Sequence, residues 1–166
     1  IDGEEAGDGS GLSVSLSADG SVVAIGSPYN DGNGNWSGHI RIYENINNNW
    51  IQIGSDIHGE AVGDKSGYSV SLSADGSVVA IGAFDNDGNG ENSGHVRIYE
   101  NVNNNWTQIG SDIEGEAPFD YSGSSVSLSS NGSIIAIGAS GNAVNGKNSG
   151  HVRIFRNVNG IWTQVG

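Results

Sequence analysis

The chain has 166 residues and a formal net charge of −13, with 6 Lys and Arg against 19 Asp and Glu. Such a charge repels phosphate backbones and anionic lipids, and no apolar run approaches the roughly 20 residues of a membrane span. Nucleic-acid binding and membrane insertion are therefore not expected. Cysteine is absent, which excludes disulfides and thiolate metal sites. A hydrophobic fraction of 35% with 28 glycines favours short β-strands joined by tight turns.

One sequence unit is repeated three times. Its copies begin at Ile1, Ile57 and Ile113, so the period is 56 residues. The spacing holds downstream, where GHIRIYENINNNWIQIG returns as GHVRIYENVNNNWTQIG and then as GHVRIFRNVNGIWTQVG. A repeat of this length predicts one structural unit per copy, at residues 1–56, 57–112 and 113–166.

Each copy contains four strand signals in the same order. In the second copy, residues 68–72 alternate Ser with apolar residues, and after an Asp-Gly turn residues 78–81 form an apolar run that is typical of a strand covered on both faces. Residues 95–99 show period-2 alternation, and an Asn-rich turn leads to residues 106–110. We therefore predict an all-β fold of three tandem four-stranded antiparallel blades of the β-propeller type. A β-solenoid is the alternative.

Three segments of the second copy carry a resemblance to a known family. SGYSV at 66–70, VAIGAF at 79–84 and GHVRIY at 94–99 resemble the FG-GAP repeat of integrin α-subunit propellers. The sequence of the whole chain is also similar to repeat arrays in secreted or surface proteins of marine bacteria and algae. The resemblance implies an extracellular or cell-surface propeller used for adhesion or assembly. The calcium loop that FG-GAP repeats often carry after their first strand is here only a turn at residues 73–77, too short to cage calcium.

Longer loops rich in Asn, Asp and Gly offer a second place for a cation. In the third copy this loop, residues 142–146, has lost its carboxylate. These residue types are also what tight turns require, and we favour that interpretation. We thus predict no cofactor, with calcium as the alternative at Asp31, Asn33, Asp87 and Asn89.

Several polar and aromatic residues recur in every copy. An active site needs one asymmetric constellation, whereas the sequence has three equal ones, so we predict no catalytic residues and no enzymatic activity. We assign the recurring residues to the fold, with each Arg held by a carboxylate of an adjoining blade and each Trp packed between blades. They are His39, His95, His151, Arg41, Arg97, Arg153, Trp50, Trp106 and Trp162.

Residues that interrupt the repeat are better indicators of individual contacts. Aromatic residues on variable loops are candidates for ligand contact, and they are Tyr29, Trp36, Phe84 and Tyr121. Three sites match the N-glycosylation sequon, at Asn35, Asn105 and Asn131.

The leading functional hypothesis is a structural or adhesive module of an extracellular assembly. Closed propellers need about four to eight blades, so three blades predict self-association into a ring or fibre, or pairing with further repeats of the same chain. The alternative is a lectin-like module that binds glycans at a cell surface. An accessory role beside a hydrolase domain is a distant third.

Overall fold

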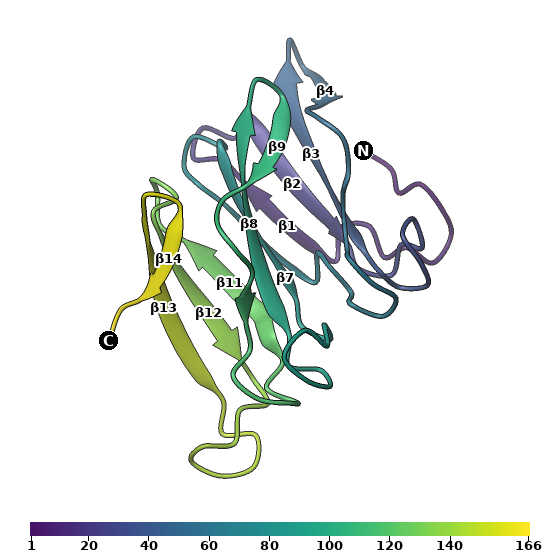
Figure 1. The fold of residues 1–166 in the computed structure, drawn as a ribbon. Coiled ribbons are helices and arrows are strands. Elements are labelled where there is room, and N and C mark those ends of the chain that lie inside the picture. The colour runs from purple at the N-terminus through teal and green to yellow at the C-terminus, as the bar shows by residue number, and fades with distance from the viewer.

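The computed structural model describes residues 1–166 and contains only β-strands, turns and loops. Three antiparallel sheets stand side by side like the blades of a fan (Figure 1). The predicted architecture of three four-stranded blades is thus confirmed. The first blade consists of β1 (Ser13–Leu16), β2 (Val22–Ser27), β3 (His39–Ile46) and β4 (Asn49–Gln52). The second consists of β6 (Ser69–Leu72), β7 (Val78–Ala83), β8 (His95–Val102) and β9 (Asn105–Gln108), and the third of β11 (Ser122–Leu128), β12 (Ile134–Ala139), β13 (His151–Val158) and β14 (Ile161–Gln164).

Two short strands extend the sheets across the repeat boundary. β5 (Ile57–His58) pairs with β3, so Ile57 lies opposite Ile40, and β10 (Ile113–Glu114) pairs with β8 in the same way. Both strands begin a new copy of the repeat but complete the sheet of the preceding blade. The start of each new repeat is therefore hydrogen-bonded to the sheet of the preceding blade, and this pairing links consecutive blades.

Turn chemistry explains where the strands end. The hairpin between β8 and β9 has positive φ at Asn103 (54°) and Asn104 (63°), which the tightest hairpin turns require and Asn tolerates. Before β7, the Asp75 Oδ1 atom accepts hydrogen bonds from the backbone N–H and the hydroxyl of Ser77 at 3.0 and 2.8 Å. These local bonds fix the register of both hairpins.

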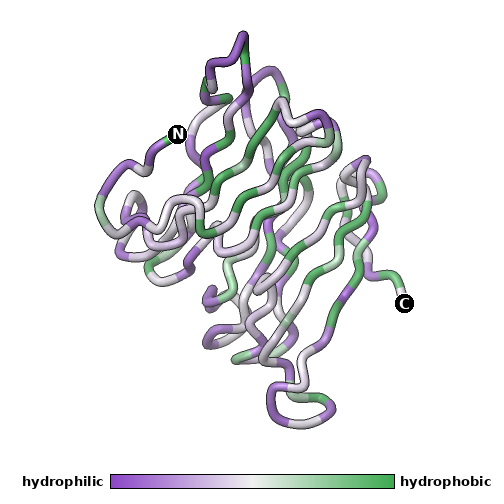
Figure 2. Tube along the Cα trace, turned by 180° about the vertical axis from the view of Figure 1, so that it is seen from behind, coloured by the Kyte–Doolittle hydropathy of each residue, from purple (hydrophilic) through white to green (hydrophobic).

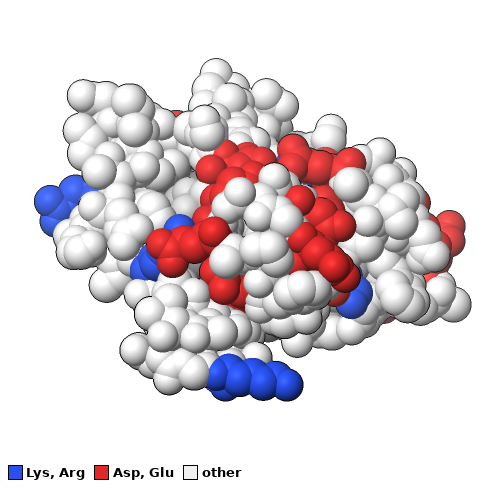
Figure 3. Space-filling view, turned by 60° about the horizontal axis from the view of Figure 1, so that its bottom comes forward, with Lys and Arg blue, Asp and Glu red and all other residues white.

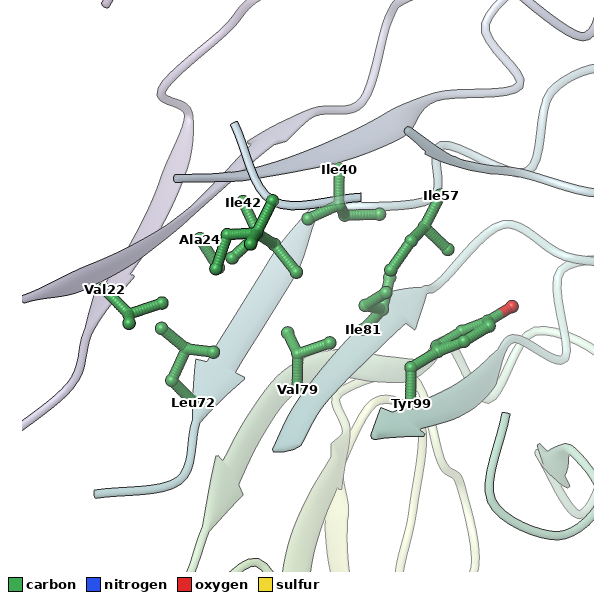
Figure 4. Packing of buried hydrophobic residues seen from close by; sticks show 10 residues of the cluster. Val22, Ala24, Ile40, Ile42, Ile57, Leu72, Val79, Ile81 and Tyr99 are labelled. Carbon is green, nitrogen blue, oxygen red and sulfur yellow. The ribbon is translucent and has the colours of Figure 1, made fainter. Parts of the chain in front are cut away.

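The core consists of two layers between blades rather than one central mass. β7 is buried along its whole length, as its apolar run predicts. The first layer joins blades 1 and 2 (Figure 4), and its buried members are Val22, Ala24, Ile40, Ile42, Ile53, Ile57, Leu72, Val79, Ile81 and Tyr99. The second layer joins blades 2 and 3 through Val78, Ala80, Val96, Ile98, Ile113, Ile135, Ile137 and Phe155. Stability thus depends on contact between consecutive blades.

The inner strands approach so closely that only glycine fits between them. A Cβ built on Gly82 would lie 2.1 Å from the carbonyl oxygen of Gly123 in the next blade. Beside it, the Ser69 hydroxyl donates to that same carbonyl at 2.7 Å. At Gly138, the equivalent residue of blade 3, a Cβ would meet only the Ser125 side chain.

Gly82→Ala should therefore destabilise the fold much more than Gly138→Ala. The alanine at 82 pushes backbone against backbone, which costs about 2–3 kcal/mol as overpacking, whereas the Ser125 hydroxyl can rotate away. Urea unfolding of both variants in dilute solution measures the difference. Equal losses would mean that the blades are not in close contact at this point.

Candidate functional site

Each internal interface joins the front face of one blade to the back face of the blade before it. The front face is formed by the first three strands, and in blade 2 it includes Leu72, Val79, Ile81 and Tyr99. The back face in blade 1 includes Val22, Ala24, Ile40, Ile42, Ile53 and Ile57. Trp106 completes this contact, because its indole N–H donates to the Ile53 carbonyl at 2.9 Å, and Trp162 repeats the bond to Ile109.

The front face of blade 1 has no blade against it. Val14 and Leu16 are 62% and 60% exposed there, whereas Leu72, which corresponds to Leu16 in the second copy, is 7% exposed. Trp50 lies on the exposed outer strand of this blade, and its indole N–H makes none of the carbonyl bonds of Trp106 and Trp162. The face that binds a preceding blade in copies 2 and 3 is thus open along β1 in copy 1, whereas Val23, Ile25 and Tyr43 on the same face form a small buried cluster.

The back face of blade 3 is open in the same way. Val152 is 65% exposed, whereas Val96, its counterpart in blade 2, is fully buried. Ile154 is also exposed, whereas its counterpart Ile98 is buried. Figure 2 shows that apolar residues continue along the strands of the outermost blades. The chain therefore presents two open apolar faces that correspond to the two halves of its own internal interface.

The recurring arginines lie buried at the junction between blades. The Arg97 guanidinium donates to the His58 carbonyl at 2.7 Å and lies 3.5 Å from the Glu60 carboxylate. Arg97 belongs to β8, whereas His58 belongs to β5 in the neighbouring sheet, so the bond joins two blades. Arg41 and Arg153 make the corresponding bonds to the carbonyls of Asp2 and Glu114. The main partner is thus a backbone carbonyl, with the carboxylate as a second and more distant one.

Arg97→Ala should destabilise the protein by about 2–3 kcal/mol, because it leaves a buried carbonyl without its charged donor. Glu60 is half exposed and can recover water, so the loss should lie at the lower end of the range for buried ion pairs. The exposed Arg156 of β13 provides the control, and Arg156→Ala should change stability by less than about 0.5 kcal/mol. Denaturant titration measures both, and similar values for the two variants would contradict the bridging role of Arg97.

The recurring histidines lie beside the arginines and face two carboxylates. His95 is buried, and its Nδ1 atom lies 3.6 Å from Asp112 and 3.9 Å from Glu60. His39 has the same surroundings, with Asp56 at 3.7 Å and Glu4 at 3.8 Å. The third His, His151, lies 3.6 Å from Glu116 and is less buried.

Burial decides the protonation of this cluster. Desolvation, aided by Arg97, lowers the pKa of His95 to about 4 despite the nearby carboxylates. Desolvation also raises the pKa of Glu60 and of Glu114, and neighbouring acidic groups raise both further. At neutral pH the His95 imidazole is therefore neutral, and Glu60 and Glu114 take up protons at a higher pH than ordinary glutamates.

The lowered pKa of His95 predicts acid sensitivity. Between pH 6.5, its ordinary pKa, and about 4, the unfolded chain binds more protons at this residue than the folded chain, so stability falls as the pH falls. At pH 5 the loss is on the order of 2 kcal/mol. The raised pKa of Glu60 and Glu114 acts in the opposite direction, because the folded chain takes up those protons first.

His95→Gln isolates the histidine contribution. Urea unfolding at pH 7 and pH 5, with chelator present, should show a smaller loss for the variant than for the unmodified chain. Equal losses in both proteins would mean that His95 is already protonated in the fold.

The four aromatic contact candidates gather at one end of the blades. Tyr29 and Trp36 meet edge to face at 6.0 Å between ring centroids, and Phe84 and Tyr121 also lie 6.0 Å apart. Lys65 links the two pairs, because its ammonium lies 5.6 Å from the Trp36 ring and 5.3 Å from the Phe84 ring. We call these five residues the aromatic row. Its lysine was not singled out from the sequence, although it replaces the Gly9 of copy 1 and the Tyr121 of copy 3.

The acidic loops lie at the same end of the molecule. Asp31 and Asp87 accept backbone N–H groups within their own loops at 2.8 and 2.7 Å. Asn33 and Asn89 donate across to the next repeat, to the carbonyls of Gly59 and Gly115. These side chains therefore serve the loops and the blade junctions. Figure 3 shows acidic residues gathered over the middle of this end.

The three sequon residues, Asn35, Asn105 and Asn131, are all exposed. Asn131 is additionally held in its turn, because its Oδ1 atom accepts from the Ser133 hydroxyl at 2.7 Å. Asp56 and Asp112 were missed from the sequence, although each recurs in the segment IGSDI that follows the fourth strand. The chain forms no helix of the length and apolarity that a membrane crossing requires.

Comparison with known proteins supports this description. Residues 58–99 match the FG-GAP repeat family, which confirms the resemblance seen in the second copy. Among solved structures, the chain is similar to Kuenenia stuttgartiensis hydrazine synthase, with 11% identity and a TM-score of 0.60 over 95% of this chain and 35% of that one. It is also similar to Saccharomyces cerevisiae Sqt1, with 14% identity and a TM-score of 0.59 over 96% of this chain and 35% of that one. No curated protein matches the sequence.

These similarities define the class of protein. At such low identity the solved structures establish the fold alone, which is of the β-propeller type. The chain spans about a third of each structure that it matches, since it covers 35% of both. The chain therefore consists of tandem blades of the β-propeller type, and residues 58–99 are similar to the FG-GAP repeat.

Proposed function

We propose that this chain is a non-enzymatic structural or adhesive module of an extracellular assembly, and that it associates head to tail with further copies of itself. The observation that carries the proposal is the pair of open faces. The front face of blade 1 and the back face of blade 3 are the two halves of an interface that the chain forms twice internally. The FG-GAP repeat, whose relatives are typical of surface proteins, supports the extracellular setting.

Contacts inside the chain give the register of the proposed interface. The Ser71 hydroxyl accepts from the backbone N–H of Leu128 in the next blade at 3.0 Å. One repeat later, the exposed Ser127 hydroxyl would accept the same bond from the backbone N–H of Leu16 in a second copy. In the same register, the free indole of Trp50 from that copy would reach the carbonyl of Val165. The hydrogen-bonding groups of blade 1 and blade 3 that lack a partner within one chain would thus find the corresponding partner in the second copy.

We assign the open faces to a second copy, or to further repeats of the same chain, because the two faces fit each other. Apolar side chains stay exposed on both faces, and contact between copies would remove them from water at about 25 cal/mol per Å². A head-to-tail contact repeats with a constant rotation, so it closes into a ring or continues as a fibre. Both outcomes use the same interface.

Sedimentation over a range of concentrations tests the proposal, and we expect species larger than one chain of 17.0 kDa. Leu16→Asp places a charge on the open front face without touching the internal interfaces and should yield monomers. Gly138→Ala should do the same, because its methyl group would meet Gly11 of a second copy as Gly82 meets Gly123. Val144→Ala, on an exposed loop, is the matched control and should still associate. A stable monomer of the unmodified chain would contradict the proposal.

The aromatic row supports a second candidate function, glycan binding. The exposed Trp36 ring, beside a lysine and three half-buried aromatic rings, suits stacking on a sugar ring, and the row lies on loops where consecutive repeats meet. A glycan array should then show binding to one sugar class that Trp36→Ala abolishes, whereas Leu16→Asp leaves it intact. Absence of reproducible binding would remove this candidate and leave the assembly proposal untouched.

A further inference from the structure

Hydrogen bonds hold only part of the polar cluster between blades: the Gln108 side-chain amide donates to Asp112 at 2.6 Å, whereas the imidazole of His95 bonds to neither nearby carboxylate. Glu60, His95 and Asp112 come from three separate segments, yet one ligand atom from each lies within 4.8 Å of the others. Glu60 follows β5, His95 begins β8, and Asp112 precedes β10. The His95 Nδ1 atom is 3.6 and 3.9 Å from the two carboxylates, which is beyond hydrogen-bonding distance. The His95 Nδ1 atom thus faces two carboxylates across gaps that a bound ion would bridge.

The first blade repeats this arrangement and shows that its imidazole lacks a partner. His39 is 1% exposed, and neither of its ring nitrogens has a hydrogen-bond partner. Its Nδ1 atom is directed at Asp56 and Glu4, at 3.7 and 3.8 Å. A buried polar nitrogen without a partner is costly, and native structures seldom keep one. In the second copy the Nε2 atom of His95 likewise has no hydrogen-bond partner. The recurrence of a buried, under-bonded imidazole beside two carboxylates indicates a built site.

The charge of the cluster also calls for a cation. The carboxylates of Asp64 and Asp112 act on Glu60, where Arg97 is the only positive group among the main influences. Glu114 lies near the same group, and its buried Oε2 atom has no hydrogen-bond partner. The shortest hydrogen bond of Arg97 goes to the backbone carbonyl of His58 and not to a carboxylate. The negative charge at this junction therefore exceeds what the protein itself compensates.

We propose that each of the two complete clusters binds a divalent transition-metal ion, Zn²⁺ in the first instance. The ligands are the His Nδ1 atom and two carboxylates, with water at the remaining position. One site is formed by Glu4, His39 and Asp56 and the other by Glu60, His95 and Asp112.

Distances and ligand types favour zinc over calcium. Bonds of about 2.0–2.1 Å in tetrahedral geometry place ligand atoms about 3.4 Å apart, so the observed separations between the His Nδ1 atoms and their carboxylates need to close by only a few tenths of an ångström. Imidazole is a common zinc ligand, whereas calcium takes six to eight oxygen ligands. The third group consists of Glu116, Asp120 and His151. It differs from the other two because it lacks the aspartate that follows the fourth strand, represented there by Asp56 and Asp112.

The position of the ion gives it a structural role. Glu60 follows β5 and Asp112 precedes β10, so both lie on the connections between consecutive sheets. His95 belongs to β8, which lies between these two connections in the sequence. An ion held by all three fixes these connections to blade 2. Because the unfolded chain lacks the assembled site, metal binding should raise the melting temperature.

Zinc titration of the chelator-treated protein tests the site, with calorimetry and thermal melts as readouts. We expect zinc to bind at micromolar or lower concentration and to raise the melting temperature by about 5 °C or more. Asp112→Asn and Asp56→Asn should each remove one equivalent of bound zinc, and the double variant should lose the rise in melting temperature. Calcium at the same concentration should produce no comparable rise.

Two controls separate metal binding from folding and from surface coordination. Asparagine keeps the shape of aspartate and removes a negative charge, so Asp112→Asn in chelator should melt at or above the temperature of the unmodified chain. His58→Ala changes an exposed histidine whose ring lies 5.9 Å from that of His39, and this variant should keep both zinc equivalents. Zinc binding that is absent, or unchanged in both Asn variants, would overturn the proposal.

Discussion

The structure depends on one interaction, the packing of the front face of each blade on the back face of the blade before it. Apart from a small cluster of Val23, Ile25 and Tyr43 in blade 1, no blade has a buried core of its own. Most buried aliphatic residues lie between sheets, and β7 contributes to the layers on both of its sides. The close approach of Gly82 to Gly123, the indole bonds to the preceding blade and the buried arginines all serve this contact. The proposed association follows from the two places where this contact is incomplete, on blade 1 and on blade 3.

Much of the fold was predictable because the repeat supplies its own internal comparison. The 56-residue period, the apolar run of the second strand and the turn residues were enough to predict three four-stranded blades. The pairing of β5 and β10 with the preceding sheet was not foreseen, because two residues at a repeat boundary carry no strand signal of their own. Such pairing depends on where neighbouring blades lie in space.

The sites were only partly predictable for the same reason. Sequence pattern selected Trp36 and Phe84 as variable aromatics, but only the fold brings them to one lysine. It also identified His95 as a recurring residue, whereas Asp112 was missed, because their meeting depends on the path between blades. The expected carboxylate partner of Arg97 is second to a carbonyl, since β5 brings its backbone closer than Glu60 brings its side chain. Repetition in the sequence thus identifies the residues with a recurring structural role. Their contact partners depend on how consecutive blades pack against each other.

The most direct measurement of the proposed association is cysteine cross-linking, which is clean because the chain has no cysteine of its own. Ile40 and Ile57 lie opposite each other between consecutive repeats, so a cysteine pair there should form a disulfide within one chain. The same register places Ile1 of one copy opposite Val152 of another. Under mild oxidation, the variant with Ile1→Cys and Val152→Cys should give a ladder of linked chains on a non-reducing gel. If the internal pair forms its disulfide while the Ile1 and Val152 cysteines yield single chains, head-to-tail association through the blade interface is contradicted.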